Sequence, residues 1–191
     1  MESSKLNVKF YADAPGLKLA SVVPIFHSWI QFHSIPDHLL IDVADYNHVP
    51  DGPGVVLVAH EANIYLDRFD GRLGLTYSRK QSLPGSFSDR LRFCFGAALQ
   101  AAALLDGNSD LGGIKFRTNE ANLKINDRLL APNSPETFAS VKPELDKFLR
   151  AFYGSEVALE HRGDSRHLFE VQIRASSAPA LEALTKHAHA G

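Results

Sequence analysis

The side chains that could bind a metal ion or transfer a proton are most concentrated between His38 and Glu61. Imidazole and carboxylate groups are common ligands of divalent metals, and histidine also acts as an acid or base near neutral pH. A loop with two glycines, 50–54, divides this segment. The candidate ligand-binding residues are His38, Asp42, Asp45, His48, Asp51, His60 and Glu61. We therefore look first for a binding site in this part of the chain.

Two short apolar runs, 39–43 and 55–58, flank this loop and are typical of strands buried on both faces. The connection between them is too short for a parallel crossover, so the two strands must pair antiparallel if they are neighbours. The expected pairing sets Leu40 opposite His60. Because side chains alternate between the two faces of a strand, this register places three reactive side chains together: His38, Asp42 and His60.

These three side chains and the neighbouring Glu61 have two interpretations. They could hold a divalent metal or form an acid–base pair, although their spacing matches no established metal-binding motif. Alternatively, the histidines belong to the core and are held by hydrogen bonds to a buried aspartate. The second interpretation is the simpler one, because buried polar side chains are normally hydrogen-bonded. The sequence identifies neither a metal nor a substrate.

The loop itself, with Asp45, His48 and Asp51, is a second candidate. Its two glycines, Gly52 and Gly54, would let a ligand approach the backbone closely. The same residue types also make ordinary tight turns, so a purely structural loop is the simpler interpretation.

A helix that begins near Pro24 is apolar over most of its surface. Its candidate interface residues are Phe26, Trp29, Ile30 and Phe32. Aromatic residues are enriched where two subunits meet, so this helix could pack between a sheet and a second copy of the chain, or it could line an apolar pocket. The simplest alternative is a helix that covers the sheet of a monomer.

Two functional hypotheses follow. The first is a protein that binds a small molecule or a divalent metal, with the option of catalysis, through the histidine–carboxylate segment. The second is a non-enzymatic interaction protein that forms a homodimer or recruits a partner through the aromatic helix. The chain contains no Walker loop and no dinucleotide-binding glycine pattern, so neither motif identifies a cofactor.

Hairpins supply most of the expected sheet. Asp70 and Gly71 are typical of a two-residue type I′ turn, which would join strands 63–69 and 72–79. The expected apolar face of this hairpin contains Ile64, Leu66, Leu73, Leu75 and Tyr77. A second hairpin is predicted over 114–128 with its turn at 119–122. A third is predicted over 157–173 with its loop around Asp164.

Helices are expected to follow these hairpins. Helical spacing predicts one helix ending near Leu105, and another that starts at Ser134 and is kinked or split by Pro143. We therefore predict an α+β fold with a largely antiparallel sheet and helices over one face. Residues 1–178 would form a single domain, and 179–191 a weakly structured C-terminal tail.

The composition limits the class of protein. With 191 residues and 45% hydrophobic content, the chain is long enough for one sizeable core. A formal net charge of -2 gives no basic field, so we expect no nucleic-acid partner. Cys94 is the only cysteine, and no apolar run is long enough to cross a bilayer. We expect a cytoplasmic protein with no membrane contact.

Overall fold

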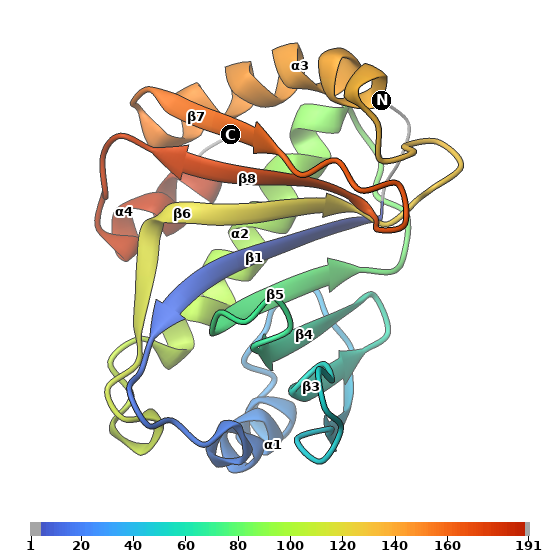
Figure 1. Ribbon diagram of the computed structural model, residues 1–191. Coiled ribbons are helices and arrows are strands. Elements are labelled where there is room, and N and C mark those ends of the chain that lie inside the picture. Colours follow the sequence, from blue (N-terminus) through green and yellow to red (C-terminus); the bar gives the residue numbers. More distant parts are fainter. Residues whose placement is uncertain (1–4, 190–191) are drawn as a thin grey trace.

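One antiparallel sheet dominates the structure, a computed structural model that describes residues 5–189. Its strands are β1 (Leu6–Asp13), β2 (Leu40–Asp45), β3 (Val55–Ala59), β4 (Ala62–Asp67), β5 (Gly74–Arg79), β6 (Lys115–Ile125), β7 (Val157–His161) and β8 (Phe169–Ala175). Its helices are α1 (Val23–Phe32), α2 (Phe87–Leu105), α3 (Pro135–Tyr153) and α4 (Leu181–His189). In space the strands follow the order β2-β3-β4-β5-β1-β6-β8-β7 (Figure 1).

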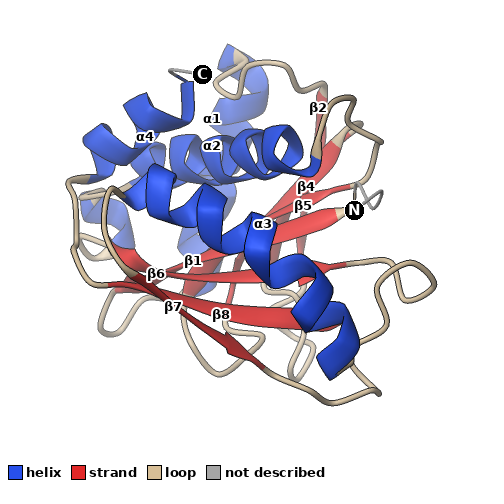
Figure 2. Cartoon of the chain, turned by 90° about the horizontal axis from the view of Figure 1, so that it is seen from above, coloured by secondary structure: helices blue, strands red, loops and turns tan. Residues whose placement is uncertain are grey.

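The helices lie on one side of this sheet and leave the other side open (Figure 2). The prediction of an α+β fold with an antiparallel sheet and helices over one face is confirmed. None of the helices within 5–189 combines the length and the apolar character needed to cross a bilayer.

Strand β1 shows how the sequence builds two different faces. Its apolar residues Leu6, Val8 and Phe10 are fully or almost fully buried in the hydrophobic core. Asn7 and Lys9 alternate with them and therefore point to the open side of the sheet. Lys9 is nevertheless only 6% exposed. The open face therefore contains a buried polar layer of its own.

The core beneath the helices is centred on an aromatic cluster. Phe95 of α2 is fully buried, and its ring contacts Phe10 of β1 at a centroid distance of 5.8 Å. It also contacts Phe148 and Phe152 of α3, at 5.6 and 5.4 Å. All three contacts are edge-on, the arrangement that aromatic pairs favour. Phe95 thus joins the sheet to two helices.

Two of the three predicted hairpins are confirmed. Strands β4 and β5 pair in the predicted register, with Ala62 opposite Arg79, but the turn is not the expected type I′, because Gly71 has a positive φ and Asp70 does not. Strands β7 and β8 also form an antiparallel pair, with His161 opposite Val171.

The second predicted hairpin is wrong. Residues 115–125 form one long strand, β6, which pairs with β1 on one side and β8 on the other. The register between β1 and β6 shifts beyond Phe10, so that Phe10 lies opposite Ala121 but Ala12 lies opposite Phe116. This irregularity changes which residues face the core, and a turn would have produced the same change in pattern.

The C-terminal part of the chain is largely helical. Helix α3 continues through Pro143 without splitting. Residues 181–189, within the segment predicted to be a weakly structured tail, form α4, and Leu184 of this helix is fully buried. Residues 1–4 and 190–191, which the predicted domain and tail also include, lie outside the described part of the chain.

Candidate functional site

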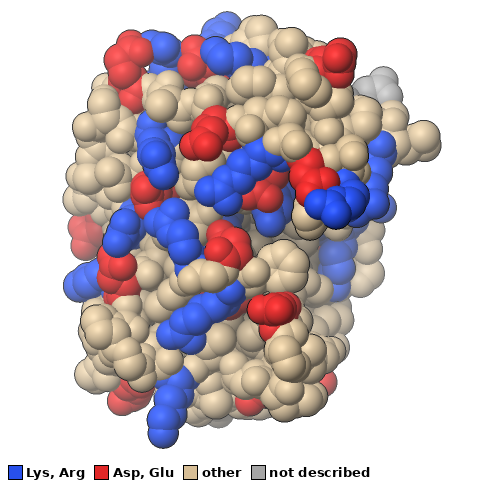
Figure 3. All heavy atoms as spheres, in the orientation of Figure 1, with Lys and Arg blue, Asp and Glu red and all other residues tan. Residues whose placement is uncertain are grey.

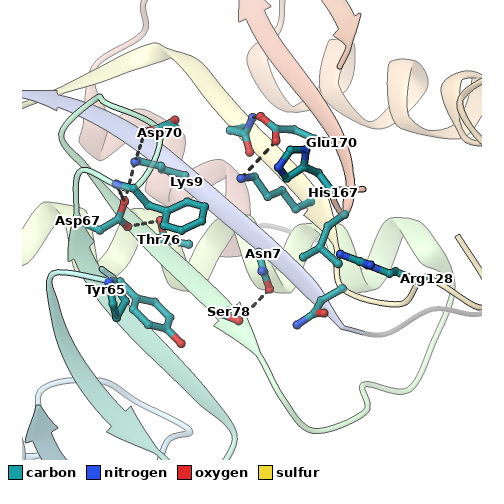
Figure 4. A pocket seen from close by; sticks show the side chains of 16 residues that line it. Asn7, Lys9, Tyr65, Asp67, Asp70, Thr76, Ser78, Arg128, His167 and Glu170 are labelled. Carbon is teal, nitrogen blue, oxygen red and sulfur yellow. Dashed lines mark hydrogen bonds and ion pairs between the residues drawn. The ribbon is translucent and has the colours of Figure 1, made fainter. Parts of the chain in front are cut away.

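A pocket of about 420 Å³ hollows the open face of the sheet (Figure 4). Residues of β1, β4, β5, β6 and β8 form it, together with the connection between β4 and β5, the segment after β6 and the loops before β3 and β8. The lining residues are Asn7, Lys9, Pro53, Tyr65, Asp67, Phe69, Asp70, Thr76, Ser78, Asn122, Lys124, Asn126, Arg128, His167, Leu168 and Glu170. Most of them carry hydrogen-bonding groups, unlike the apolar residues on the helix side.

A buried ion-pair network centred on Lys9 forms one wall of this pocket. The Lys9 Nζ lies 2.7 Å from Asp67 Oδ1 and 2.6 Å from Asp70 Oδ1. It also donates to the carbonyl oxygen of Arg72, at 2.8 Å. Thr76 donates to the other carboxylate oxygen of Asp67, at 2.7 Å. The three donors of the ammonium therefore all have acceptors, which fixes the side chain in place.

Tyr11 extends this network across the sheet. Its phenol oxygen lies 3.0 Å from Asp70 Oδ2 and 2.9 Å from the side-chain oxygen of Gln172 on β8. Burial and the neighbouring charge of Asp70 raise the pKa of Tyr11 well above its ordinary value. Burial also acts to raise the pKa of Asp70, but the hydrogen bond and charge of Lys9 outweigh it and lower that pKa. At neutral pH the phenol is thus protonated and the carboxyl is ionised.

The rest of the pocket combines amide, hydroxyl and cationic groups. Ser78 donates to the side-chain oxygen of Asn7, at 2.8 Å. Lys124 lies 3.2 Å from Glu170 and 5.4 Å from the centre of the Phe69 ring. Arg128 donates to a backbone carbonyl, and its guanidinium has no carboxylate partner among residues 5–189. Figure 4 shows Tyr65 and Asp67 on one side of the pocket, with Arg128 and His167 on the other.

None of the seven ligand-binding residues predicted from the sequence lines this pocket. The lining residues could have been found among the polar residues that alternate with apolar ones in each strand. Examples are Asn7 and Lys9 in β1, and Thr76 and Ser78 in β5. What the sequence lacked was the neighbour order, because β1 pairs with the distant strands β5 and β6.

The predicted site residue His38 makes two hydrogen bonds within the protein. Its Nδ1 lies 2.7 Å from the carbonyl oxygen of Pro36, and its Nε2 lies 2.8 Å from the phenol oxygen of Tyr77. Because a carbonyl only accepts, neutral His38 carries its hydrogen on Nδ1 and accepts from Tyr77 at Nε2. Burial raises the pKa of Tyr77, which keeps this phenol a donor.

The predicted register of β2 is wrong at its first residue. Leu40 lies opposite Ala59 instead of His60, because the pairing is irregular between Leu40 and Asp42. Asp42 is exposed, and its carboxylate accepts from the backbone N–H of Val43 instead of a histidine. The arrangement expected for His38, Asp42 and His60 on one regular face is therefore not formed.

Within the predicted cluster, the charges of His38 and His60 both act on the pKa of Glu61. Burial acts to raise its pKa, but the N–H groups of Leu39 and Glu61 and the charges of His38 and His60 outweigh this and lower it. The carboxylate of Glu61 accepts from Leu39 N–H at 2.8 Å, next to the start of β2. Within residues 5–189, no group of three or more His, Cys, Asp or Glu side chains is placed to hold a metal ion.

Hydrogen bonds within the turn and close packing against β4 explain the residue types of the loop between β2 and β3. The Asp45 carboxylate accepts from the backbone and side-chain N–H groups of Asn47, at 2.9 and 2.5 Å, which closes the turn. His48 and Asp51 are exposed. A Cβ added to Gly54 would lie 2.3 Å from the carbonyl oxygen of Leu66. Close approach of β4 therefore accounts for this glycine without a ligand.

The predicted interface residues of α1 divide between core and surface. Phe26 and Trp29 are buried in the core, at 0% and 4% exposure. Ile30 is partly buried against that core, whereas Phe32 is 71% exposed. The apolar surface of this helix is thus mostly used within the protein.

Replacing His38 by Ala is expected to lower the free energy of unfolding by about 1–3 kcal/mol, because the buried phenol of Tyr77 loses its acceptor. Chemical denaturation measures this change. His60→Ala is the matched control, since His60 is exposed, and should change stability by less than about 0.5 kcal/mol. In a Tyr77→Phe background the cost of His38→Ala should shrink; an undiminished cost would contradict the assigned hydrogen bond.

No known protein-family model matches this chain, and no curated protein matches its sequence significantly. The functional argument therefore rests on the geometry and chemistry of the site itself.

Proposed function

We propose that this protein binds a small polar organic molecule in the pocket on the open face of the sheet. The observation that carries the proposal is a pocket of ligand size built on a buried network of Lys9, Asp67 and Asp70. Its volume of about 420 Å³ lies within the range usual for small-molecule sites. The proposal keeps the small-molecule class expected from the sequence and moves the site away from His38 and His60.

The buried ion pairs support binding more than they support stability. Taking charges out of water costs about as much as their mutual attraction returns, so such networks contribute little net stability. What the network supplies is fixed positions for polar groups, because Lys9 is held by Asp67, Asp70 and the Arg72 carbonyl. A site with preset polar groups loses less conformational entropy when a ligand binds.

The lining indicates the chemistry of the ligand. Tyr65 and the 62%-exposed Phe69 offer aromatic surface, and Asn7, Ser78 and Asn126 offer neutral hydrogen-bonding groups. The Arg128 guanidinium, which has no carboxylate partner in the described chain, favours an acidic group on the ligand. A molecule with a hydrogen-bonding body, a flat apolar part and one acidic group matches these features.

Binding is a better match than catalysis for the buried network behind the pocket. A general acid or base works best when its pKa lies near the working pH. The pKa of Tyr11 is raised and that of Asp70 is lowered, so neither group exchanges a proton readily at neutral pH. We therefore propose a binding protein.

The test fills the pocket with a larger side chain. Untagged protein is equilibrated with a defined mixture of amino acids, organic acids, sugars and nucleosides, and retained ligands are identified by native mass spectrometry. Ser78→Tyr inserts a ring into the pocket and should weaken retention by about tenfold or more. Ser140→Tyr makes the same change on an exposed position of α3 and should retain the ligand.

Two results would contradict this proposal. One is that folded wild-type protein retains no component of the mixture at millimolar concentration. The other is that Ser78→Tyr retains a component as well as Ser140→Tyr does, which would place binding elsewhere on the molecule.

A further inference from the structure

A second hollow on the open side of the sheet is lined by three arginines. It has a volume of about 320 Å³ and shares no lining residue with the first pocket. Arg68 and Arg72 come from the connection between β4 and β5, and Arg117 comes from β6. Figure 3 shows basic side chains gathered, with acidic ones among them, along the side of this face where β1 ends and β6 begins.

Arg72 is held in place by neighbours on two strands. Its guanidinium carbon lies 3.7 Å from the ring centre of Tyr11, and one terminal nitrogen pairs with Glu120. Glu120 also faces Arg117 at 3.6 Å and Arg174 at 3.4 Å. Burial acts to raise the pKa of Glu120, but Arg72 and the other two arginines outweigh it and lower that pKa. One ionised carboxylate is thus shared by three guanidinium groups.

The remaining acidic group at this hollow is already paired. Asp13 accepts from Nε and Nη2 of Arg117, at 2.8 and 3.0 Å. Arg68 donates from Nη2 to the carbonyl oxygen of Leu17, at 3.1 Å, and pairs with no carboxylate among the residues described. Four arginines, Arg174 included, therefore face two carboxylates. These six groups carry a net charge of +2. The nearby network of Lys9, with one ammonium and two carboxylates, carries −1, so a net positive charge remains.

The donors that remain free indicate the shape of the missing partner. Arg68 and Arg72 each use Nη2, so Nε and Nη1 of both groups have no acceptor within 5–189. A guanidinium has two planar forks that match carboxylate or phosphate oxygens, Nε with Nη2 and Nη1 with Nη2, so each group keeps one fork besides the hydrogen bond that Nη2 already makes. A carboxylate can also accept from several guanidiniums, as Glu120 does, but a phosphate has three terminal oxygens and close to two negative charges, which matches two forks in a positively charged hollow.

We propose that this arginine pocket binds the phosphate group of a small molecule or inorganic phosphate itself. Arg68 and Arg72 donate to the phosphate oxygens, and Arg117 adds positive charge at the wall. The stacking of Arg72 on Tyr11 and its pair with Glu120 preset one of the two forks. The two pockets share no lining residue, although Asp70 of the first hydrogen-bonds Tyr11 of the second.

Isothermal titration calorimetry tests the proposal with two probes, inorganic phosphate and methyl phosphate, each against sodium chloride at equal ionic strength. Wild-type protein should bind at least one probe with a Kd of about 1 mM or below. Arg68→Gln removes a guanidinium that makes only one backbone hydrogen bond, and should weaken binding by about tenfold or more. Tighter binding of methyl phosphate would identify a phosphorylated small molecule, and tighter binding of inorganic phosphate would identify the free ion.

Two variants act as controls. Arg166→Gln removes an arginine that is 84% exposed and paired with Asp164, and should leave phosphate binding unchanged. Ser78→Tyr should also leave it unchanged, which separates this site from the first pocket. The proposal is overturned if phosphate produces no more heat than chloride, or if folded Arg68→Gln binds the probes as wild-type protein does.

Discussion

Lys9→Met is expected to lower the free energy of unfolding by about 3–5 kcal/mol, the usual effect of breaking a buried ion pair by removing one partner. Methionine fills most of the space of the lysine stem, so the loss is mainly electrostatic. Asp67 would remain buried and Asp70 partly buried without the ammonium that now lies 2.7 and 2.6 Å from them. Chemical denaturation at neutral pH measures the effect.

The pH dependence of this effect has a definite sign. In the wild type the pKa of Asp70 is lowered, so its contribution to stability is present above the pKa of unfolded aspartate and is lost as the pH falls through the folded value. Without Lys9, burial raises the pKa of Asp70, and protonation of this carboxyl removes the cost of an unpaired charge. The difference between wild type and variant should therefore shrink between pH 7 and about pH 3.

Lys115→Met is the matched control for Lys9→Met. Lys115 also pairs with a carboxylate, that of Asp106 at 2.7 Å, but its side chain is 67% exposed. Its loss should cost less than about 1 kcal/mol, because exposed ion pairs contribute little. Equal effects of the two substitutions would show that the Lys9 network is not buried as described.

Phe95→Ala is expected to lower the free energy of unfolding by about 3–5 kcal/mol, the range found when a buried aromatic side chain is truncated. The ring of Phe95 lies between Phe10 of the sheet and two rings of α3, at 5.4–5.8 Å between centres. The neighbouring rings are fixed on β1 and α3 and cannot all close the gap, so a cavity should remain. Thermal and chemical denaturation both measure the loss.

Leu129→Ala provides the surface comparison for Phe95→Ala, because Leu129 is 91% exposed. Its truncation should change stability by less than about 0.5 kcal/mol. Phe95→Leu, which keeps part of the volume, should fall between the two. A Phe95→Ala protein as stable as Leu129→Ala would mean that the aromatic cluster does not hold the helices to the sheet.

Local features of the sequence predicted the fold where they are unambiguous. Asp70 and Gly71 predicted the register of β4 with β5, although the turn that joins them is not the expected type I′. The hairpin predicted over 114–128 was wrong because an irregular pairing and a turn both move apolar residues from one face to the other. Phe116 and Ala121 lie on opposite sides of such an irregularity, and only the partner strand β1 reveals it.

The candidate site was harder to predict than the fold. His38 and Asp42 attracted attention by residue type, yet His38 hydrogen-bonds within the protein and Asp42 lies beyond the irregularity in β2. Lys9 carried no such signal, since a lysine on an alternating strand is usually exposed. Its burial depends on Asp67 and Asp70, more than fifty residues away in sequence, as the separation of 58 shows. Such non-local contacts are not visible in one sequence.

The central position of β1 also determines when the sheet can be completed during synthesis. This strand leaves the ribosome before both of its neighbours, β5 (74–79) and β6 (115–125). The strands β2 to β5 form a meander of sequential neighbours and can pair as they emerge. In contrast, β1 must wait for partners that are distant in sequence, and contacts of this kind form slowly. The nascent chain therefore holds an apolar strand unpaired until much of the protein has been made.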